Sequence, residues 1–212
     1  MNMQEMRYVQ YGCGWCAPQG WVNFDGSPTV RFERLPLLGH LYKKNANRFP
    51  QNVHFGDIIR GLPVEDSSCD AVYCSHVLEH LALEDFRLAL KNTLRILKPG
   101  GRFRFVVPDL EVLCQKYLSN PSSEAAKVFL LEACLGEERR SRTFPEFLKS
   151  WLGNSRHLWM WDYKSIVPEL EGAGFVHVRK ASFGDSCDAM FTAVEDKGRW
   201  EDCLGIECSR PK

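Results

Sequence analysis

Residues 84–107 read EDFRLALKNTLRILKPGGRFRFVV, a helical stretch that runs directly into a β-type run. Its apolar side chains recur three or four residues apart, the spacing of one helix face: Phe86, Leu90, Leu94 and Leu97. Pro99-Gly100-Gly101 stops the helix and turns the chain into the strand pattern of residues 102–107. A helix followed by a strand in this way indicates a βαβ unit of a parallel sheet.

The same alternation of short β-type runs and helical stretches continues on both sides of this unit. We expect strands at residues 8–11, 21–24, 52–55, 70–74, 102–107, 175–181 and 189–194. We expect helices at residues 33–46, 84–97, 111–118, 124–135 and 164–171. The predicted fold class is therefore α/β, a Rossmann-like doubly wound sheet.

Residues 110–161 carry helical patterns only, and we interpret them as a helical cap inserted into a single domain of residues 1–212. Pro168 lies inside the helix expected at 164–171 and predicts a kink or a later start. Asp162 is placed to cap that helix.

The composition is ordinary for a globular protein with one substantial core. There are 27 basic and 27 acidic residues, and this zero formal charge argues against a nucleic-acid partner. No signal-peptide pattern opens the chain, and no apolar run reaches the length of a membrane span. Nine cysteines without framework spacing favour reduced thiols in a cytoplasmic protein. The oligomeric state is unknown from the sequence.

Residues suited to a ligand follow the predicted strands, and an open parallel sheet binds ligands at the carboxyl ends of its strands. Gly12 and Gly14 follow the first strand and allow a ligand close to the backbone. Asp25 ends the second strand, where a carboxylate can accept both hydroxyls of a ribose. Asp57 follows the third and can accept from an adenine amino group. The fourth strand is followed by Ser75 and His76.

Taken together, these motifs resemble the class I S-adenosylmethionine-dependent methyltransferases, in particular the type-11-like branch. The matching pieces are residues 11–14, 20–25, 61–72, 76–81, 97–101, 158–163 and 173–175. The resemblance implies a seven-stranded sheet with a reversed final strand, and S-adenosylmethionine as the cofactor. It further implies a methionine site at Gly12, Cys13 and Gly14, a ribose site at Asp25, an adenine side at Asp57 and Ile58, and a floor near the methyl group at Ser75 and His76.

Two features depart from the common pattern of this family. Cys16 stands where many relatives have a third glycine, and the interval from Gly14 to Asp25 is too short for a helix plus a strand. It resembles a subgroup with a loop in place of the first helix, often found near sugar and polysaccharide genes. We therefore expect methyl transfer to oxygen or nitrogen of a small-molecule acceptor, a sugar or polysaccharide precursor. The alternative is a non-catalytic cofactor-binding module that partners a glycosyltransferase.

Three side chains are candidates for removing a proton from the acceptor: His76, His157 and Asp109, in that order of preference. Three tryptophans lie near His157 in the sequence: Trp151, Trp159 and Trp161. We expect them either to pack the cap onto the sheet or to form a wall of the acceptor pocket that stacks on a sugar ring.

Other chemistries have weaker patterns. His76-Val77-Leu78-Glu79-His80 fits the His-x-x-Glu-His pattern of some zinc proteases, but we interpret it as part of the cofactor pocket and predict no metal site. Cys13 and Cys16 are interpreted as structural. A nicotinamide-dependent oxidoreductase shares the fold class, yet the glycines of its fingerprint are incomplete.

Overall fold

The computed structural model describes residues 7–35, 48–136 and 156–212. In this part of the chain seven strands form one sheet in the order β3-β2-β1-β4-β5-β7-β6. All neighbours are parallel except β7, which is antiparallel to both β5 and β6. This order, with its reversed final strand, confirms the predicted fold class. The strands are β1 (Tyr8–Tyr11), β2 (Trp21–Asp25), β3 (Val53–Phe55), β4 (Cys69–Ser75), β5 (Leu97–Pro108), β6 (Val176–Ala181) and β7 (Cys203–Ser209).

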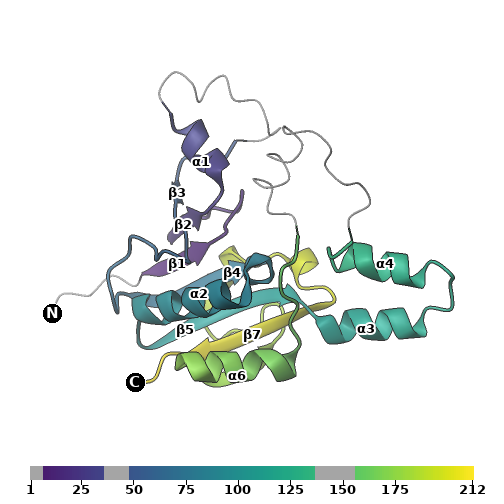
Figure 1. Cartoon of the computed structure of the whole chain (residues 1–212). Coiled ribbons are helices and arrows are strands. Elements are labelled where there is room, and N and C mark those ends of the chain that lie inside the picture. Colours follow the sequence, from purple (N-terminus) through teal and green to yellow (C-terminus); the bar gives the residue numbers. More distant parts are fainter. Residues whose placement is uncertain (1–6, 36–47, 137–155) are drawn as a thin grey trace.

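The α-helices flank this sheet and extend beyond its end (Figure 1). Those in the described residues are α1 (Pro28–Glu33), α2 (Leu83–Ile96), α3 (Leu110–Ser119), α4 (Ala125–Glu132) and α6 (Tyr163–Ala173). Short 3-10 helices are η1 (Leu78–His80), η2 (Ala189–Ala193) and η3 (Lys197–Arg199). Figure 1 shows α3 and α4 beyond the carboxyl end of β5.

The helix and strand of residues 84–107 form as predicted, with α2 leading directly into β5. The predicted helical face is the one that packs on the sheet, because Phe86, Leu90 and Leu97 are fully buried and Leu94 packs against the same core. Pro99-Gly100-Gly101 lies inside β5 rather than between the two elements, and Gly100 has a left-handed φ of 77° there. In α6, Asp162 caps the N-terminus as expected, by accepting a hydrogen bond of 2.8 Å from the backbone of Ser165. Pro168 lies inside this helix.

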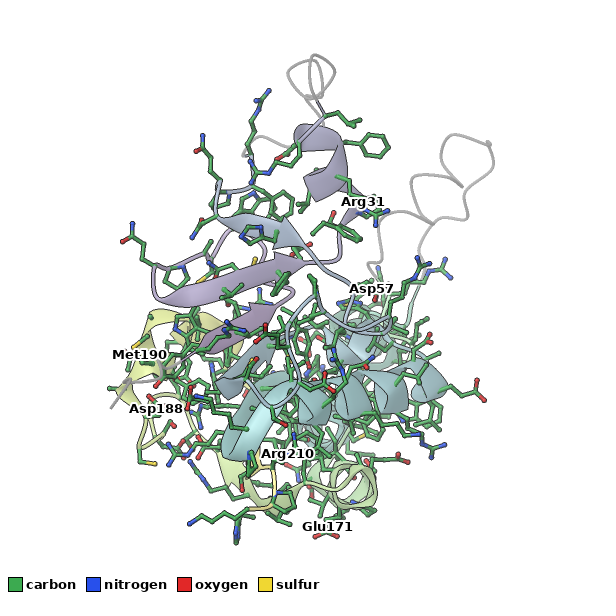
Figure 2. The ribbon with its side chains drawn as sticks, turned by 90° about the vertical axis from the view of Figure 1, so that its left-hand side faces the viewer. Arg31, Asp57, Glu171, Asp188, Met190 and Arg210 are labelled. Carbon is green, nitrogen blue, oxygen red and sulfur yellow. The ribbon has the colours of Figure 1, made fainter. Side chains whose placement is uncertain are left out.

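The two faces of the sheet are covered differently. Alternate residues of the strands, such as Val9 of β1 and Val72 of β4, belong to a large apolar core with α2 and α6. The residues between them, such as Tyr8 and Tyr73, pack on the connection between β6 and β7. This connection carries η2 and η3, and Figure 2 shows its residues Asp188 and Met190 on the side of the molecule away from Asp57.

The prediction of a final strand at residues 189–194 was wrong. These residues contain η2. Asp188 caps the N-terminus of η2, because its side chain accepts a hydrogen bond from the backbone N–H of Met190. Phe191 and Val194 are buried, but against the face of the sheet and not within it. The final strand is β7, where Leu204, Ile206 and Cys208 alternate into the core.

Two other expectations fall near the limits of the described residues, and a third concerns the loop between β1 and β2. A helix was expected at 33–46, whereas α1 ends at Glu33, and residues 36–47 lie outside the described residues. In the expected cap, α3 and α4 agree with the sequence pattern, but residues 137–155 also lie outside them. Between β1 and β2 the described chain forms a loop and no helix, as the short interval indicated.

Candidate active site

Two glycines turn the loop that follows β1, and their surroundings differ. Gly12 has a φ of 64° and Gly14 a φ of 54°, both in the left-handed region that favours glycine. A Cβ at Gly12 would meet Val77 Cγ2 at 2.1 Å, whereas a Cβ at Gly14 would meet no atom within 4 Å. Gly12 therefore lets the loop pack closely on the segment after β4. Gly14 leaves open space in front of the backbone, where a ligand can approach.

A cavity of about 350 Å³ opens beside this loop, at the carboxyl ends of β1 and β4. Its size is within the range of small-molecule sites, roughly 300–1,000 Å³. Three segments line it: the glycine loop, the end of β4, and the β6–β7 connection. The lining residues that matter below are Gly12, Cys13, Gly14, Ser75, Asp196 and Arg199.

Asp25 ends β2 and directs its buried carboxylate toward the glycine loop. Its Oδ2 accepts a hydrogen bond of 2.9 Å from the Gly14 backbone, and its Oδ1 accepts one of 2.8 Å from the Ser27 backbone. Asp25 thus lies against the glycine turn, although it is not among the residues that line the cavity. A carboxylate has about four acceptor positions, so these two bonds leave capacity for a ligand hydroxyl.

Asp57 and Ile58 have other partners. Asp57 Oδ1 accepts from the Ile59 backbone at 2.9 Å, and Oδ2 lies 3.4 Å from Arg60 Nε. The Ile58 side chain is buried in the apolar core. The ends of β2 and β3 are adjacent, since the Gly56 N–H donates to the Asp25 carbonyl at 3.1 Å. The Asp57 carboxylate is nevertheless engaged in its own turn, and neither residue lines the cavity.

Arg199 of η3 supplies a positive charge at the cavity. Its Nε donates to Ser75 Oγ at 2.7 Å and its NH2 donates to the Ser75 carbonyl at 2.8 Å. Asp196, the N-cap of η3, supplies a negative charge, although its Oδ1 accepts from the Gly198 backbone at 2.8 Å. Glu195 also lines the cavity, but its carboxylate is paired with the buried Arg104. A cavity bordered by charges of both signs suits a zwitterion with an ammonium and a carboxylate.

Sequence reasoning missed Arg199 and Asp196. Both belong to a connection that had been assigned in part to a strand, and no local motif marks them. Their role depends on the packing of the β6–β7 connection over the strand ends, which connects residues far apart in the chain.

His76 follows β4 with a left-handed φ of 52° and both ring nitrogens are engaged. Nδ1 lies 3.0 Å from Glu79 Oε1, and Nε2 lies 2.9 Å from the Arg199 carbonyl. Burial alone would lower the pKa of His76, but Cys203, Glu79 and the Arg199 carbonyl outweigh it and raise the pKa to about 10. Both nitrogens then donate, so the imidazolium has no lone pair with which to accept a proton.

None of the three candidate bases is among the residues that line the cavity. His157 is mostly buried, with Nε2 4.0 Å from Glu79 Oε1, and burial lowers the pKa of His157. Asp109 is buried and caps α3 by accepting from the Glu111 backbone at 2.9 Å. His76, His157 and Asp109 therefore do not meet at one point of the cavity.

The tryptophans divide between core and surface. Trp161 is buried against Phe86, with ring centroids 4.4 Å apart, so it packs the core. Trp159 is 41% exposed and its ring lies 6.0 Å from that of Trp161. Trp151 lies outside the described residues.

The cysteines, all nine of which lie in the described ranges, form no disulfide. Cys13 is buried in the glycine loop, and this burial raises the pKa of its thiol to about 12. Cys16 is exposed, and its backbone N–H donates to the Cys13 carbonyl at 3.0 Å. The pair is thus part of the turn. No helix in the described part of the chain is long and apolar enough to cross a membrane.

Comparison with known proteins agrees with this fold. Residues 9–105 match the family model described as a methyltransferase domain. The chain is 30% identical over 125 residues to an uncharacterized 37.1 kDa protein in a transposon of Streptomyces fradiae. This match covers 57% of the chain and about a third of that relative (34%).

Two solved structures show the same fold at low identity. One is from the complex between the Haloferax volcanii Trm112 methyltransferase activator and a methyltransferase, with 18% identity and a TM-score of 0.51 over 98% of this chain and 84% of that one. The other is a S-adenosylmethionine-dependent methyltransferase of Archaeoglobus fulgidus, with 15% identity and a TM-score of 0.50 over 97% of this chain and 86% of that one.

The sheet order is that of the Rossmann-like methyltransferase fold, and residues 9–105, somewhat under half of the chain, match the methyltransferase domain family. The matched residues include the glycine loop and the strands β2 to β4, and the match is consistent with the type-11-like branch of class I. The resemblance found in the sequence is thereby confirmed, and S-adenosylmethionine is the cofactor that this domain implies.

Proposed function

We propose that this methyltransferase transfers the methyl group of S-adenosylmethionine to an oxygen or nitrogen of a small acceptor, a sugar or polysaccharide precursor. The observation that supports the cofactor's position is the cavity beside Gly14, which has open space in front of the backbone and is bordered by the side chains of Arg199 and Asp196. In this proposal Arg199 pairs with the carboxylate of the methionine part and Asp196 with its ammonium.

The remaining part of the cofactor extends along the ends of β2 and β3. Asp25 receives the ribose hydroxyls while it continues to hold the Gly14 backbone. Asp57 and Ile58 are proposed for the adenine side, and the Asp57 carboxylate keeps acceptor positions for this role beside its bond with the Ile59 backbone. Ser75 and His76 form the floor toward the methyl group.

The cofactor's sulfonium supplies the reactive methyl group. The protein's task is to place the acceptor atom in line with that methyl, at about 3 Å. We do not assign proton removal to His76, because both of its nitrogens donate hydrogen bonds. Orientation of the acceptor is therefore the main contribution of this site in the proposal.

An exposed aromatic ring supports a sugar-like acceptor. Trp159 presents its ring near the segment after β4, because its backbone N–H donates to the Glu79 carbonyl at 3.1 Å. A flat indole face can stack on the apolar face of a sugar. The proposed cap, residues 110–161, contributes this wall.

Titration calorimetry with S-adenosylmethionine tests the cofactor site. We expect the wild type to bind and Arg199→Met to bind about 10- to 100-fold more weakly, the effect of losing one charge-assisted hydrogen bond. Gly14→Val should also weaken binding, because its side chain would enter the open space. Arg87→Met is a matched control, since Arg87 is exposed on α2 and pairs with Glu169 of α6. Absence of binding by the wild type, or unchanged binding by Arg199→Met, would contradict the proposed site.

Turnover with a panel of acceptors tests the reaction. Release of S-adenosylhomocysteine should be stimulated by monosaccharides or nucleotide sugars, and Trp159→Ala should raise KM for the acceptor more than it lowers kcat. Stimulation by primary amines instead would move the proposal from hydroxyl to nitrogen acceptors. Cofactor binding without turnover on any acceptor would support the non-catalytic module that partners a glycosyltransferase.

A further inference from the structure

Three potential metal ligands meet beside η1, outside the lining of the cofactor cavity. One ligand atom from each of Glu79, His80 and His157 lies within 4.8 Å of the others, the one such group among the described residues. Two of the three belong to the His-x-x-Glu-His pattern of residues 76–80. The third member of the group is not His76, the first histidine of that pattern, but His157 from a distant part of the chain.

The Glu79 carboxylate has one oxygen whose partner is missing. Glu79 is fully buried, and its Oε1 lies 3.0 Å from His76 Nδ1. Its Oε2 is also buried and has no hydrogen-bond partner among the described residues. A buried acceptor without a partner costs about 1–3 kcal/mol, and more for a charged group. Such an atom in a folded protein indicates a bound group, such as an ion or water, in contact with it.

His80 has the orientation of a metal ligand. Its Nδ1 lies 2.8 Å from the Arg156 carbonyl, so Nδ1 carries the proton and Nε2 keeps its lone pair. Metal-binding histidines are oriented in this way, with the second nitrogen donating to a carbonyl or carboxylate. The rings of His80 and His157 are close, with centroids 5.0 Å apart at an angle of 66°.

The backbone holds the two segments together before any ion binds. The N–H groups of Leu158 and Trp159 donate to the Glu79 carbonyl at 2.7 and 3.1 Å. The His157 N–H donates to the Cys134 carbonyl at 3.4 Å. Glu79 and His157 are thus placed next to each other by contacts that do not involve their side chains.

We propose that Glu79, His80 and His157 bind a divalent transition metal ion, for which zinc is the best match. Two imidazoles and one carboxylate are a ligand set of catalytic zinc sites, which keep a fourth position open for water or substrate. In this arrangement Glu79 Oε2 binds the ion while Oε1 retains His76. The site ties η1, which begins three residues after Ser75 of the cavity, to the segment that carries His157. The open position is available to an oxygen of the acceptor.

Metal-stripped full-length protein titrated with Zn²⁺ in a calorimeter tests this site. We expect one equivalent to bind to the wild type, and His157→Gln and Glu79→Gln to bind at least about 10-fold more weakly. Co²⁺ gives a second reading, since coordination by these ligands produces visible absorption bands that the two variants lack. His177→Gln and Cys187→Ser, which alter exposed residues elsewhere, are controls that should bind Zn²⁺ like the wild type.

Two outcomes would overturn the proposal: no Zn²⁺ bound by the wild type, or equal Zn²⁺ affinity of His157→Gln and wild type. The second would place the ion on cysteines or show only a polar network at Glu79. Binding of S-adenosylmethionine is measured on every variant and reports separately on folding and on the cofactor site. A failure of the metal site therefore remains distinguishable from a failure of the proposed methyl transfer.

Discussion

The two faces of the sheet are covered by different kinds of structure. On one face α2 and α6 bury an apolar core that includes Val72, Phe86 and Phe103. On the other face the strands present polar residues as well as aromatic rings, among them Gln10, Asn23 and Arg104, all buried. The β6–β7 connection covers this second face, next to the loop that stands where a helix would be expected between β1 and β2. The comparison teaches that this face is held by specific polar contacts, and that these contacts also form the cofactor cavity.

Arg104 is the centre of those polar contacts. It is fully buried on β5 and its guanidinium pairs with Glu195, Asp185 and Glu207. Its NH2 also donates to the Ser182 carbonyl at 2.7 Å. Because Glu195 and Ser182 belong to the β6–β7 connection, Arg104 fixes this connection to the sheet directly behind Asp196 and Arg199.

The largest expected effect comes from Arg104→Met. Removal of one partner from a buried ion cluster leaves uncompensated charges, which costs about 3–5 kcal/mol. We expect the free energy of unfolding, measured by urea denaturation, to fall by that amount, and the affinity for S-adenosylmethionine to fall with it. Arg87→Met breaks an exposed ion pair on the helical face and should change neither quantity measurably. Similar effects of the two substitutions would remove the distinction between the faces.

A smaller effect is expected from a pair of matched apolar substitutions. Phe86 of the helical face and Phe191 of η2 are both buried, so Phe86→Leu and Phe191→Leu should each cost about 1–2 kcal/mol of unfolding free energy. Only Phe191→Leu should weaken cofactor binding, because Phe191 contacts Trp21 and Tyr73 beneath the cavity wall, with ring centroids 5.7 and 6.2 Å apart. Calorimetry on both variants decides this. Equal cofactor affinities would mean that the connection does not shape the cavity.

The smallest expected effect is a loss of stability at acidic pH that depends on Asp185. Burial opposes ionisation of Asp185, but Arg179, the Ser182 N–H and Arg104 outweigh it and lower its pKa from 3.8 to about 2. A depressed pKa contributes stability that is present above pH 3.8 and is lost as the pH falls toward 2. We therefore expect the stability difference between wild type and Asp185→Asn to shrink across that interval, as followed by thermal unfolding. A difference that stays constant with pH would show that these contacts do not depend on the charge of Asp185.

The helical half of the fold was predictable because its signals are local. The spacing of Phe86, Leu90 and Leu94 in α2 and the β-type run of β5 lie within one stretch of sequence. The final strand was missed because Gly205 interrupts its pattern. The structure gives the reason for this glycine, since a Cβ there would meet Trp200 Cζ3 at 2.2 Å and the Ala181 carbonyl at 2.5 Å. A glycine in a strand can mark such a close approach, but the sequence does not say what approaches.

Part of the candidate site was likewise predictable from local sequence signals, and part was not. Gly12, Gly14 and Asp25 follow strands, so the rule for parallel sheets identifies them. Arg199 and Asp196 reach the cavity through packing of a connection whose course depends on Arg104 and Trp200, and no pattern near either residue reports this. His157 likewise comes next to Glu79 only through backbone contacts between distant segments.

The cavity wall joins parts of the chain that are synthesised at different times. Arg199 and Ser75 are hydrogen-bonded although 124 residues separate them in the sequence. On the ribosome, β1 to β5 can therefore emerge and pair while the cofactor cavity still lacks one side. Such a nascent chain would bind S-adenosylmethionine only after η3 has left the exit tunnel, so ligand binding cannot assist the folding of the first half of the sheet.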